Sequence, residues 1–323
     1  MLLLLQRLGD AAVIEEFIAE VVTRDYDGSE DAALVASLRI LDAKKAAGLL
    51  AELMRQRMPD LSGHCVDLLH ALAFKSDLTA DETGRVALRR IAEAAVSKLD
   101  EIGKGEARGE WLGWWVREKT HAVDTALVAK LLDALGILAA PALRAEAVEK
   151  LIARPNPFDP VTILVPALRK IRQQDAAARR LWEHSADFLV KRSGHPPASP
   201  TDWRQDVNLS CSCADCRGLQ AFALDPDERT RRFSVRKDRR QHLHQIIERH
   251  CLDMTHVTER RGSPQTLICT KDRRSYKRRC EQYRGDIAAL ASLTELSGTI
   301  GASATWLEKI GSARAQAARW TPA

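Results

Sequence analysis

Long apolar runs are missing from this sequence. No stretch approaches the roughly 20 apolar residues that a membrane-spanning helix needs, so we expect no contact with a membrane. The opening apolar run at residues 1–5 has no basic residue before it and ends at Gln6 and Arg7. A secretory signal peptide has a basic lead-in and a longer apolar core. These absences predict a cytoplasmic protein.

Cysteine is nearly absent from the first 210 residues. Of the seven cysteines, Cys65 stands alone and the other six lie between residues 211 and 280. Disulfide frameworks are rare in a reducing compartment, where a dense cysteine cluster more often binds a metal ion. The distribution therefore predicts a metal site near the C-terminal end of the sequence.

The alternation of apolar and polar residues that marks β-strands is missing from residues 10 to about 192. Apolar residues recur at helical spacing instead, and Asp10, Asp42 and Asp124 stand where they can cap helices. We expect a mostly α protein in which residues 1–192 form an all-α array. Because no repeat motif is evident, the array is either a HEAT-like stack of helix pairs or a globular bundle.

Three tryptophans follow a glycine-containing loop in this helical region. We expect Trp111, Trp114 and Trp115 to pack inward from an amphipathic helix, because buried aromatic mass is their commoner use. The alternative is a surface for a protein partner. The helical array as a whole is also a candidate docking surface for such a partner.

Proline and glycine mark the boundary between two regions. Residues 193–202 form a Pro-rich run that cannot continue a helix, and we expect an extended linker there. Beyond it we expect a small α+β zinc-binding module at residues 203–297 and a partly helical tail at residues 298–323. The expected elements of the module are a helix at 219–224, a strand at 232–236, a helix capped by Asp238 that ends near 250, strands at 254–261 and 266–271, and a final helix with an apolar stripe of Tyr276, Cys280, Tyr283, Ile287 and Leu290.

The module opens with three cysteines within six residues, in the pattern C-x-C-x-x-C. Cys211, Cys213 and Cys216 place three thiolates where one ion is held at about 2.3 Å from each sulfur. Zinc is the expected cofactor, because thiolate and imidazole ligands suit it in a closed tetrahedral site. An iron–sulfur cluster is the alternative, but it usually takes a fourth cysteine.

The fourth ligand is expected from the helix that follows. His242 and His244 lie two residues apart and face different ways on a helix, so we do not expect one ion to bind both. We favour His242 and keep His244 as the alternative, with Cys251 as a further candidate. Cys269 and Cys280 are expected to be small buried core residues.

Positive charge is concentrated in one part of the sequence. Residues 229–284 contain 17 Lys and Arg residues against 6 Asp and Glu residues, a net charge of +11, whereas the whole chain carries +5. This asymmetry predicts an anionic partner, with nucleic acid the expected one, for example at the N-terminus of the final helix. The alternative is a solvated basic face, or one that pairs with the acidic helical region. The candidate anion-binding residues are Arg239, Arg240, Arg273, Arg274, Arg278 and Arg279.

Several segments of the module resemble a known family. They are DW at 202–203, CSCADC at 211–216, LQAF at 219–222, RRQHLH at 239–244, THVTER at 255–260 and GSPQTL at 262–267. Together they resemble the C-terminal, non-catalytic region of large bacterial and fungal proteins of the 2-oxoglutarate/Fe(II) oxygenase family. The match covers roughly residues 200–290, and the helical region resembles the middle of the same proteins more weakly.

The iron-binding motif of that family is missing. The family carries its chemistry on an upstream double-stranded β-helix with a His-x-Asp/Glu…His iron triad, and this sequence has no His-x-Asp or His-x-Glu. The resemblance therefore implies the non-catalytic remainder of such a protein, split off or cut short. We expect a non-catalytic, zinc-stabilised binding or scaffold module. The alternative is a fragment or accessory part of a 2-oxoglutarate/Fe(II)-dependent oxygenase whose iron domain lies elsewhere.

Overall fold

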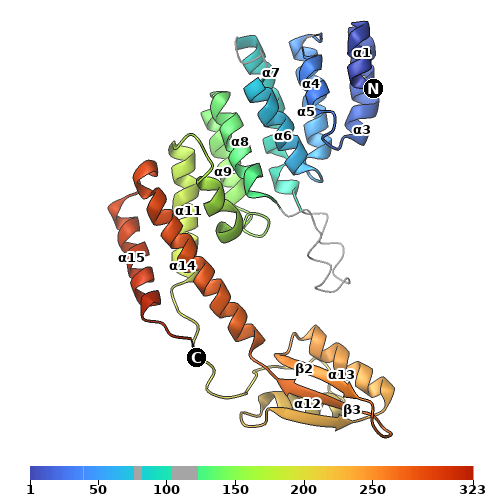
Figure 1. Ribbon diagram of the computed structural model, residues 1–323, viewed down its shortest axis with the longest axis vertical. Coiled ribbons are helices and arrows are strands. Elements are labelled where there is room, and N and C mark those ends of the chain that lie inside the picture. Colours follow the sequence, from blue (N-terminus) through green and yellow to red (C-terminus); the bar gives the residue numbers. More distant parts are fainter. Residues whose placement is uncertain (39, 76–81, 104–122, 323) are drawn as a thin grey trace. The chain divides into compact units, whose positions relative to one another are not determined.

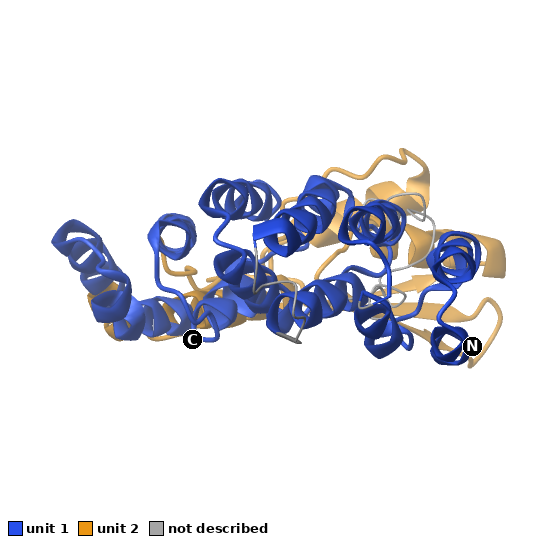
Figure 2. Ribbon diagram, turned by 90° about the horizontal axis from the view of Figure 1, so that it is seen from above, with its two compact units in different colours: residues 1–191, 288–314 blue, residues 192–287, 315–323 orange. Residues whose placement is uncertain are grey.

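The computed structural model describes residues 1–322 except residue 39, residues 76–81 and residues 104–122, and the three clustered tryptophans lie outside the described residues. The described part is mostly α-helical with one small three-stranded sheet, which confirms the predicted fold class (Figure 1). The chain divides into two compact units (Figure 2). Unit 1 comprises residues 1–191 and 288–314, and unit 2 comprises residues 192–287 and 315–323.

The described part of unit 1 consists mostly of helices. Its α-helices begin with α1 (Leu2–Leu8), α2 (Ala11–Phe17), α3 (Thr23–Asp25), α4 (Asp31–Ser37), α5 (Ala43–Arg57) and α6 (Ser62–Lys75). They continue with α7 (Glu82–Ser97), α8 (Thr125–Ile137), α9 (Pro141–Ile152), α10 (Val165–Leu168), α11 (Ala176–Arg192) and α15 (Ala304–Ala318), the last two of which end just inside unit 2. Shorter helical turns cover Ile18–Val22, Leu99–Glu101 and Pro160–Leu164.

The three predicted aspartate caps are confirmed. The carboxylate of Asp10 accepts hydrogen bonds from two backbone N–H groups in the first turn of α2. Asp42 does the same for α5, and Asp124 accepts one such bond at the start of α8. Each cap satisfies amides that the helix itself leaves without a partner, which explains why these helices begin where the sequence predicted.

The helices of unit 1 pack in two layers. Helix α5 packs against α7, and α6 packs against α8, so that alternate helices are neighbours. Figure 2 shows several helices of unit 1 nearly end-on and side by side. This packing is typical of stacked helix pairs, and buried leucine, valine and alanine side chains fill the space between them. The HEAT-like repeat stays a prediction, because the sequence shows no repeat motif.

The longest helix of the described residues, α14 (Arg274–Ile300), contributes to both units. Its residues up to Ile287 belong to unit 2, and those from Ala288 belong to unit 1. In unit 1 the buried indole of Trp182 donates a hydrogen bond of 3.0 Å to the carbonyl oxygen of Leu293. The sequence predicted a module at residues 203–297 and a tail at residues 298–323. The structure divides the chain at other points, because α14 runs without a break through the predicted end of the module.

Unit 2 has the predicted α+β order. Its elements are α12 (Ala214–Leu224), β1 (Thr230–Ser234), α13 (Lys237–Arg249), β2 (Met254–Glu259), β3 (Thr266–Lys271) and the first part of α14. The bounds of β3 are those predicted, whereas α12 begins five residues earlier than predicted. Arg236 occupies the N-cap position of α13 and forms no side-chain capping hydrogen bond, and Asp238 lies in the first turn, so Asp238 is not the predicted cap.

The sheet of unit 2 is antiparallel, with β3 between β1 and β2. Side chains alternate between its faces, and Leu267 and Cys269 of β3 point into a core. The same core takes Leu219 and Phe222 from α12 and Leu243 from α13. One face of the sheet is therefore covered by the two helices that carry the cysteine and histidine residues.

The Pro-rich run at residues 193–202 contains no helix or strand, as predicted, but it is not a free linker. It belongs to unit 2, where the hydroxyl groups of Ser199 and Tyr276 lie 2.9 Å apart. The indole of Trp320 donates a hydrogen bond of 3.1 Å to the carbonyl oxygen of Pro197. Polar and aromatic contacts hold the run in place.

A survey of the described helices for candidate membrane spans found none that combines the length and the apolar character that crossing a bilayer requires.

A buried ion pair joins the start of unit 2 to α14. Arg192 pairs with Asp286, whose side chain is 1% exposed. We predict that Arg192→Gln destabilises the protein by about 3–5 kcal/mol, because it leaves a buried carboxylate without its cation. The matched control is Lys191→Gln, which removes an exposed pair with Asp187 and costs about 0–1 kcal/mol. Urea unfolding followed by circular dichroism measures both, and equal losses would contradict the prediction.

Candidate metal centre

The cysteine cluster lies where an extended segment enters α12. Cys213 is the N-cap residue of α12, and its sulfur accepts the backbone N–H of Cys216 at 3.5 Å. This places Cys216 in the first turn of the helix, where its side chain is buried. Cys211 lies two residues before the cap and is half-buried against the same core. The helix start therefore turns all three thiols toward one point.

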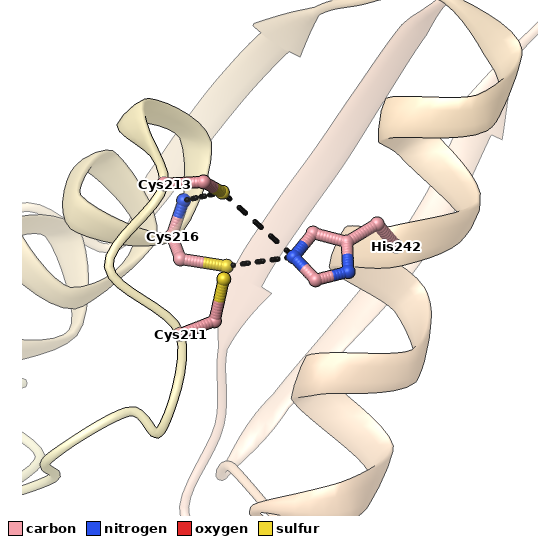
Figure 3. Close-up of side chains that lie close together, drawn as sticks. All are labelled: Cys211, Cys213, Cys216 and His242. Carbon is pink, nitrogen blue, oxygen red and sulfur yellow. Dashed lines mark hydrogen bonds between the residues drawn. The ribbon is translucent and has the colours of Figure 1, made fainter.

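His242 completes the group from α13. Its Nε2 atom lies 3.2 Å from the sulfur of Cys216 and 3.7 Å from the sulfur of Cys213 (Figure 3). In a tetrahedral site with bonds of about 2.0 Å to nitrogen and about 2.3 Å to sulfur, the nitrogen and sulfur atoms are about 3.5 Å apart. The four ligand atoms all lie within 4.8 Å of one another, and this group can hold a metal ion.

An ion pair braces the two elements that supply the ligands. Asp215 lies between Cys213 and Cys216, and its carboxylate pairs with the guanidinium group of Arg239. Arg239 is one helical turn before His242 on α13. The pair raises the pKa of Arg239, chiefly through its hydrogen bond to Asp215. It fixes the helix that carries the imidazole against the loop that carries the thiols.

His244 is not part of the group, which corrects the alternative left open by the sequence. Its Nδ1 atom lies within hydrogen-bond distance of Nδ1 of His256 on β2, and its Nε2 atom lies 3.3 Å from the hydroxyl of Thr258. Burial lowers the pKa of both imidazoles. Residues two apart on a helix point in different directions, so α13 sends His242 to the cysteines and His244 to the sheet.

The remaining cysteines lie apart from the group. Cys269 and Cys280 are buried, as predicted, and burial raises the pKa of Cys269 to about 12. Cys251 is exposed after the end of α13 and is not among the four residues that converge. Among the described residues no other such group forms.

The two thiols nearest His242 differ in acidity. The backbone N–H of Cys216 stabilises the thiolate of Cys213 and lowers its pKa to about 7. Burial raises the pKa of the Cys216 thiol to about 12. A metal ion takes both as thiolates, so its binding displaces a proton from Cys216 even at neutral pH.

The predicted anion-binding arginines have different surroundings. Arg239 forms the brace described above, and Arg274 pairs with Asp272. Arg240 is 8% exposed and donates hydrogen bonds to the carbonyl oxygen of Val235 and to Gln265. Because these acceptors use its guanidinium group inside the protein, Arg240 stabilises the fold and is not available to an anion. This corrects its predicted role.

The N-terminus of α14 also differs from the prediction. The carboxylate of Asp253 accepts the backbone N–H of Ser275 at 3.0 Å, and Asp272 accepts the N–H of Arg274 at 3.1 Å. These carboxylates occupy the amides that a phosphate was expected to meet. Arg278 and Arg279 are exposed on α14 and form no ion pair among the described residues. Arg273 stacks on Trp203.

Two features of this site were missed by the sequence analysis. The brace between Asp215 and Arg239 had a signal, since each lies within a helical turn of a ligand. The pairing of Trp203 with two arginines had no such signal, because these partners lie 26 and 70 residues away in the sequence.

Neither a family model, nor a curated protein, nor a solved structure matches the chain. The resemblance to the oxygenase family therefore stays a prediction.

We predict about one bound metal ion per chain, lost in His242→Ala and in Cys216→Ala because each removes one of four ligands. The matched controls are His244→Ala and Cys251→Ala, which alter a histidine and a cysteine outside the group and keep the ion. Elemental analysis of protein dialysed against a weak chelator measures the content. Loss of the ion in His244→Ala with retention in His242→Ala would overturn the assignment.

Metal affinity is predicted to rise with pH, because a bound ion replaces thiol protons. Cys213 loses its proton near a pKa of about 7, whereas Cys216 still holds its own. The number of protons released per ion should fall by about one between about pH 6 and about pH 8. Calorimetry in buffers of different ionisation enthalpy counts these protons. The same count at both pH values in the wild type would contradict the prediction, and Cys251→Ser should behave as wild type does.

Proposed function

We propose that unit 2 is a non-catalytic binding module, stabilised by zinc, that binds nucleic acid through its basic surface. The observation that carries the proposal is the convergence of Cys211, Cys213, Cys216 and His242. Three thiolates and one imidazole fill the four positions of a tetrahedral ion and leave none open for a substrate or water. Such a site contributes folding energy to a small domain rather than chemistry.

The donor set supports zinc as the ion. Thiolates are soft ligands, and a mixed set of sulfur and nitrogen at tetrahedral spacing is typical of structural zinc. The site joins two short helices, α12 with 11 residues and α13 with 13 residues. Isolated helices of this length are marginal in water, so an ion that links them adds stability where the core is small.

The basic surface consists of the Lys and Arg side chains that form no ion pair among the described residues. Within the basic window, Arg231 pairs with Glu228 and Arg232 pairs with Glu259. Together with the paired and buried arginines described above, these residues have structural partners. In the described part of the chain, the following cations of the window form no ion pair: Arg229, Arg236, Lys237, Arg249, Arg260, Arg261, Arg273, Lys277, Arg278, Arg279 and Arg284.

The topology places many of these cations at the two ends of the sheet. Arg236 and Lys237 follow β1, and Arg260 and Arg261 follow β2, at one end. Residues 229 and 273–279 lie at the opposite end, where β1 begins and β3 leads into α14. Unpaired Lys and Arg side chains gain affinity for nucleic acid by releasing the counterions of its phosphates. The polyanion is therefore the partner whose chemistry fits best.

We predict salt-dependent binding of the full chain to duplex DNA or RNA, with little dependence on base sequence. Arg278→Gln with Arg279→Gln should weaken binding and reduce the log–log slope against salt by up to about two on duplex DNA, about 0.9 per lost phosphate contact. The control, Arg24→Gln with Arg55→Gln, changes the net charge equally at exposed, ion-paired sites of unit 1. Mobility-shift titrations at several salt concentrations measure both, and equal slopes for the two double variants would count against the proposal.

A further inference from the structure

Trp203 has two arginine side chains over its indole ring. The guanidinium carbon of Arg229 lies 4.6 Å from the ring centroid, and that of Arg273 lies 4.8 Å from it. Both distances are within the range of a cation–π interaction. The two positive charges therefore lie within about 10 Å of one another, where like charges repel unless something compensates them.

Backbone hydrogen bonds fix all three residues at one end of the sheet. The N–H of Trp203 donates to the carbonyl oxygen of Pro226 at 2.9 Å, just after α12. The carbonyl oxygen of Arg229 accepts the N–H of Lys271 at 2.8 Å, which extends the pairing of β1 with β3. Arg273 immediately precedes α14, and its carbonyl oxygen accepts the N–H of Lys277. The fold therefore brings the backbones of these three residues to the same end of the sheet.

Carboxylates near these arginines have other partners. Asp272 pairs with Arg274, and Glu228 pairs with Arg231. The carboxylate of Asp225 accepts the backbone N–H groups of residues 227 and 228. Arg229 and Arg273 form no ion pair among the described residues, and the buried Nε atom of Arg273 has no hydrogen-bond partner there. Neither guanidinium group therefore has a carboxylate as its direct partner among the described residues.

We propose that Arg229, Trp203 and Arg273 form a clamp for a phosphate group. A guanidinium group that lies over an aromatic ring can still offer N–H groups at its edge to a ligand; in Arg273 these are the Nη1 and Nη2 groups, because Nε is buried. Two such edges match the oxygens of a phosphate. Because the arginines lie over the indole, the ring supports them and is not a platform for stacking a base. The contact is therefore to the backbone of a nucleic acid and fixes position without reading sequence.

That the phosphate belongs to a nucleic acid rests on the proposed function. The experiments below test the clamp and the proposed function separately. Arg229→Lys with Arg273→Lys keeps both charges but loses the planar fork and its stacking. We expect this variant of the full chain to bind a short duplex DNA about tenfold more weakly or worse, as expected for lost charge-assisted hydrogen bonds, with an unchanged salt slope. The control, Arg24→Lys with Arg55→Lys at exposed, ion-paired sites of unit 1, should bind as the wild type does. Metal content and thermal melting check the fold, and each single Arg→Lys variant repeats the test with a smaller change.

A second probe is inorganic phosphate, followed by NMR of the arginine Nε–H and tryptophan indole N–H signals. If duplex binds and the Arg229→Lys, Arg273→Lys variant binds it as the wild type does, the clamp is wrong and the proposed function stands. If no nucleic acid binds, but phosphate shifts signals in the wild type and not in the variant, the clamp is right and the nucleic-acid function is wrong. If neither probe binds, both are overturned.

Discussion

The contact between the start of α12 and the second turn of α13 is the constraint on which unit 2 depends. Two sulfurs and one imidazole nitrogen meet there at 3.2 and 3.7 Å, and the ion pair of Asp215 with Arg239 holds the same two elements beside them. Both helices then cover one face of a sheet with only three short strands. Such a domain buries little apolar surface, so a link between its helices has a large effect on whether the fold persists.

The basic residues of unit 2 serve different purposes, and their surroundings separate them. Arg240 and Lys271 are buried and donate to carbonyl oxygens, so they hold the sheet and its loops together. Other arginines pair with carboxylates that lie close in the fold. The arginines over Trp203 have a ring beneath them and no carboxylate partner among the described residues, which makes them the most specific anion-binding feature that we infer. A net charge counted along the sequence adds up buried, paired and unpaired basic residues without distinguishing them.

The sequence predicted local structure better than the surroundings of single residues. The alternation at residues 266–271 gave β3 its bounds, and Asp10, Asp42 and Asp124 gave helix starts, because both signals are local. The choice between His242 and His244 depended on which side of α13 faces the cysteines, and this follows only from the packing of the helix on the sheet. In the same way, Arg239 and Arg240 are adjacent in sequence, yet one is exposed and the other buried. The predicted end of the module at residue 297 differs from the end of unit 2 within α14. The periodicity of apolar residues detects this helix, but it does not show which unit each part of the helix packs against.

The order of the segments has a consequence for synthesis on the ribosome. Unit 1 takes residues 288–314 from beyond unit 2, and unit 2 takes residues 315–323 from beyond those. Tyr283 therefore cannot pack against Trp320, at a ring-centroid distance of 4.8 Å, until nearly all of the described chain has been translated. The two units do not finish folding one after the other, as separate domains on a chain often do. The indole of Trp182 in α11 can meet its acceptor, Leu293, only after the candidate metal ligands of unit 2 have been translated.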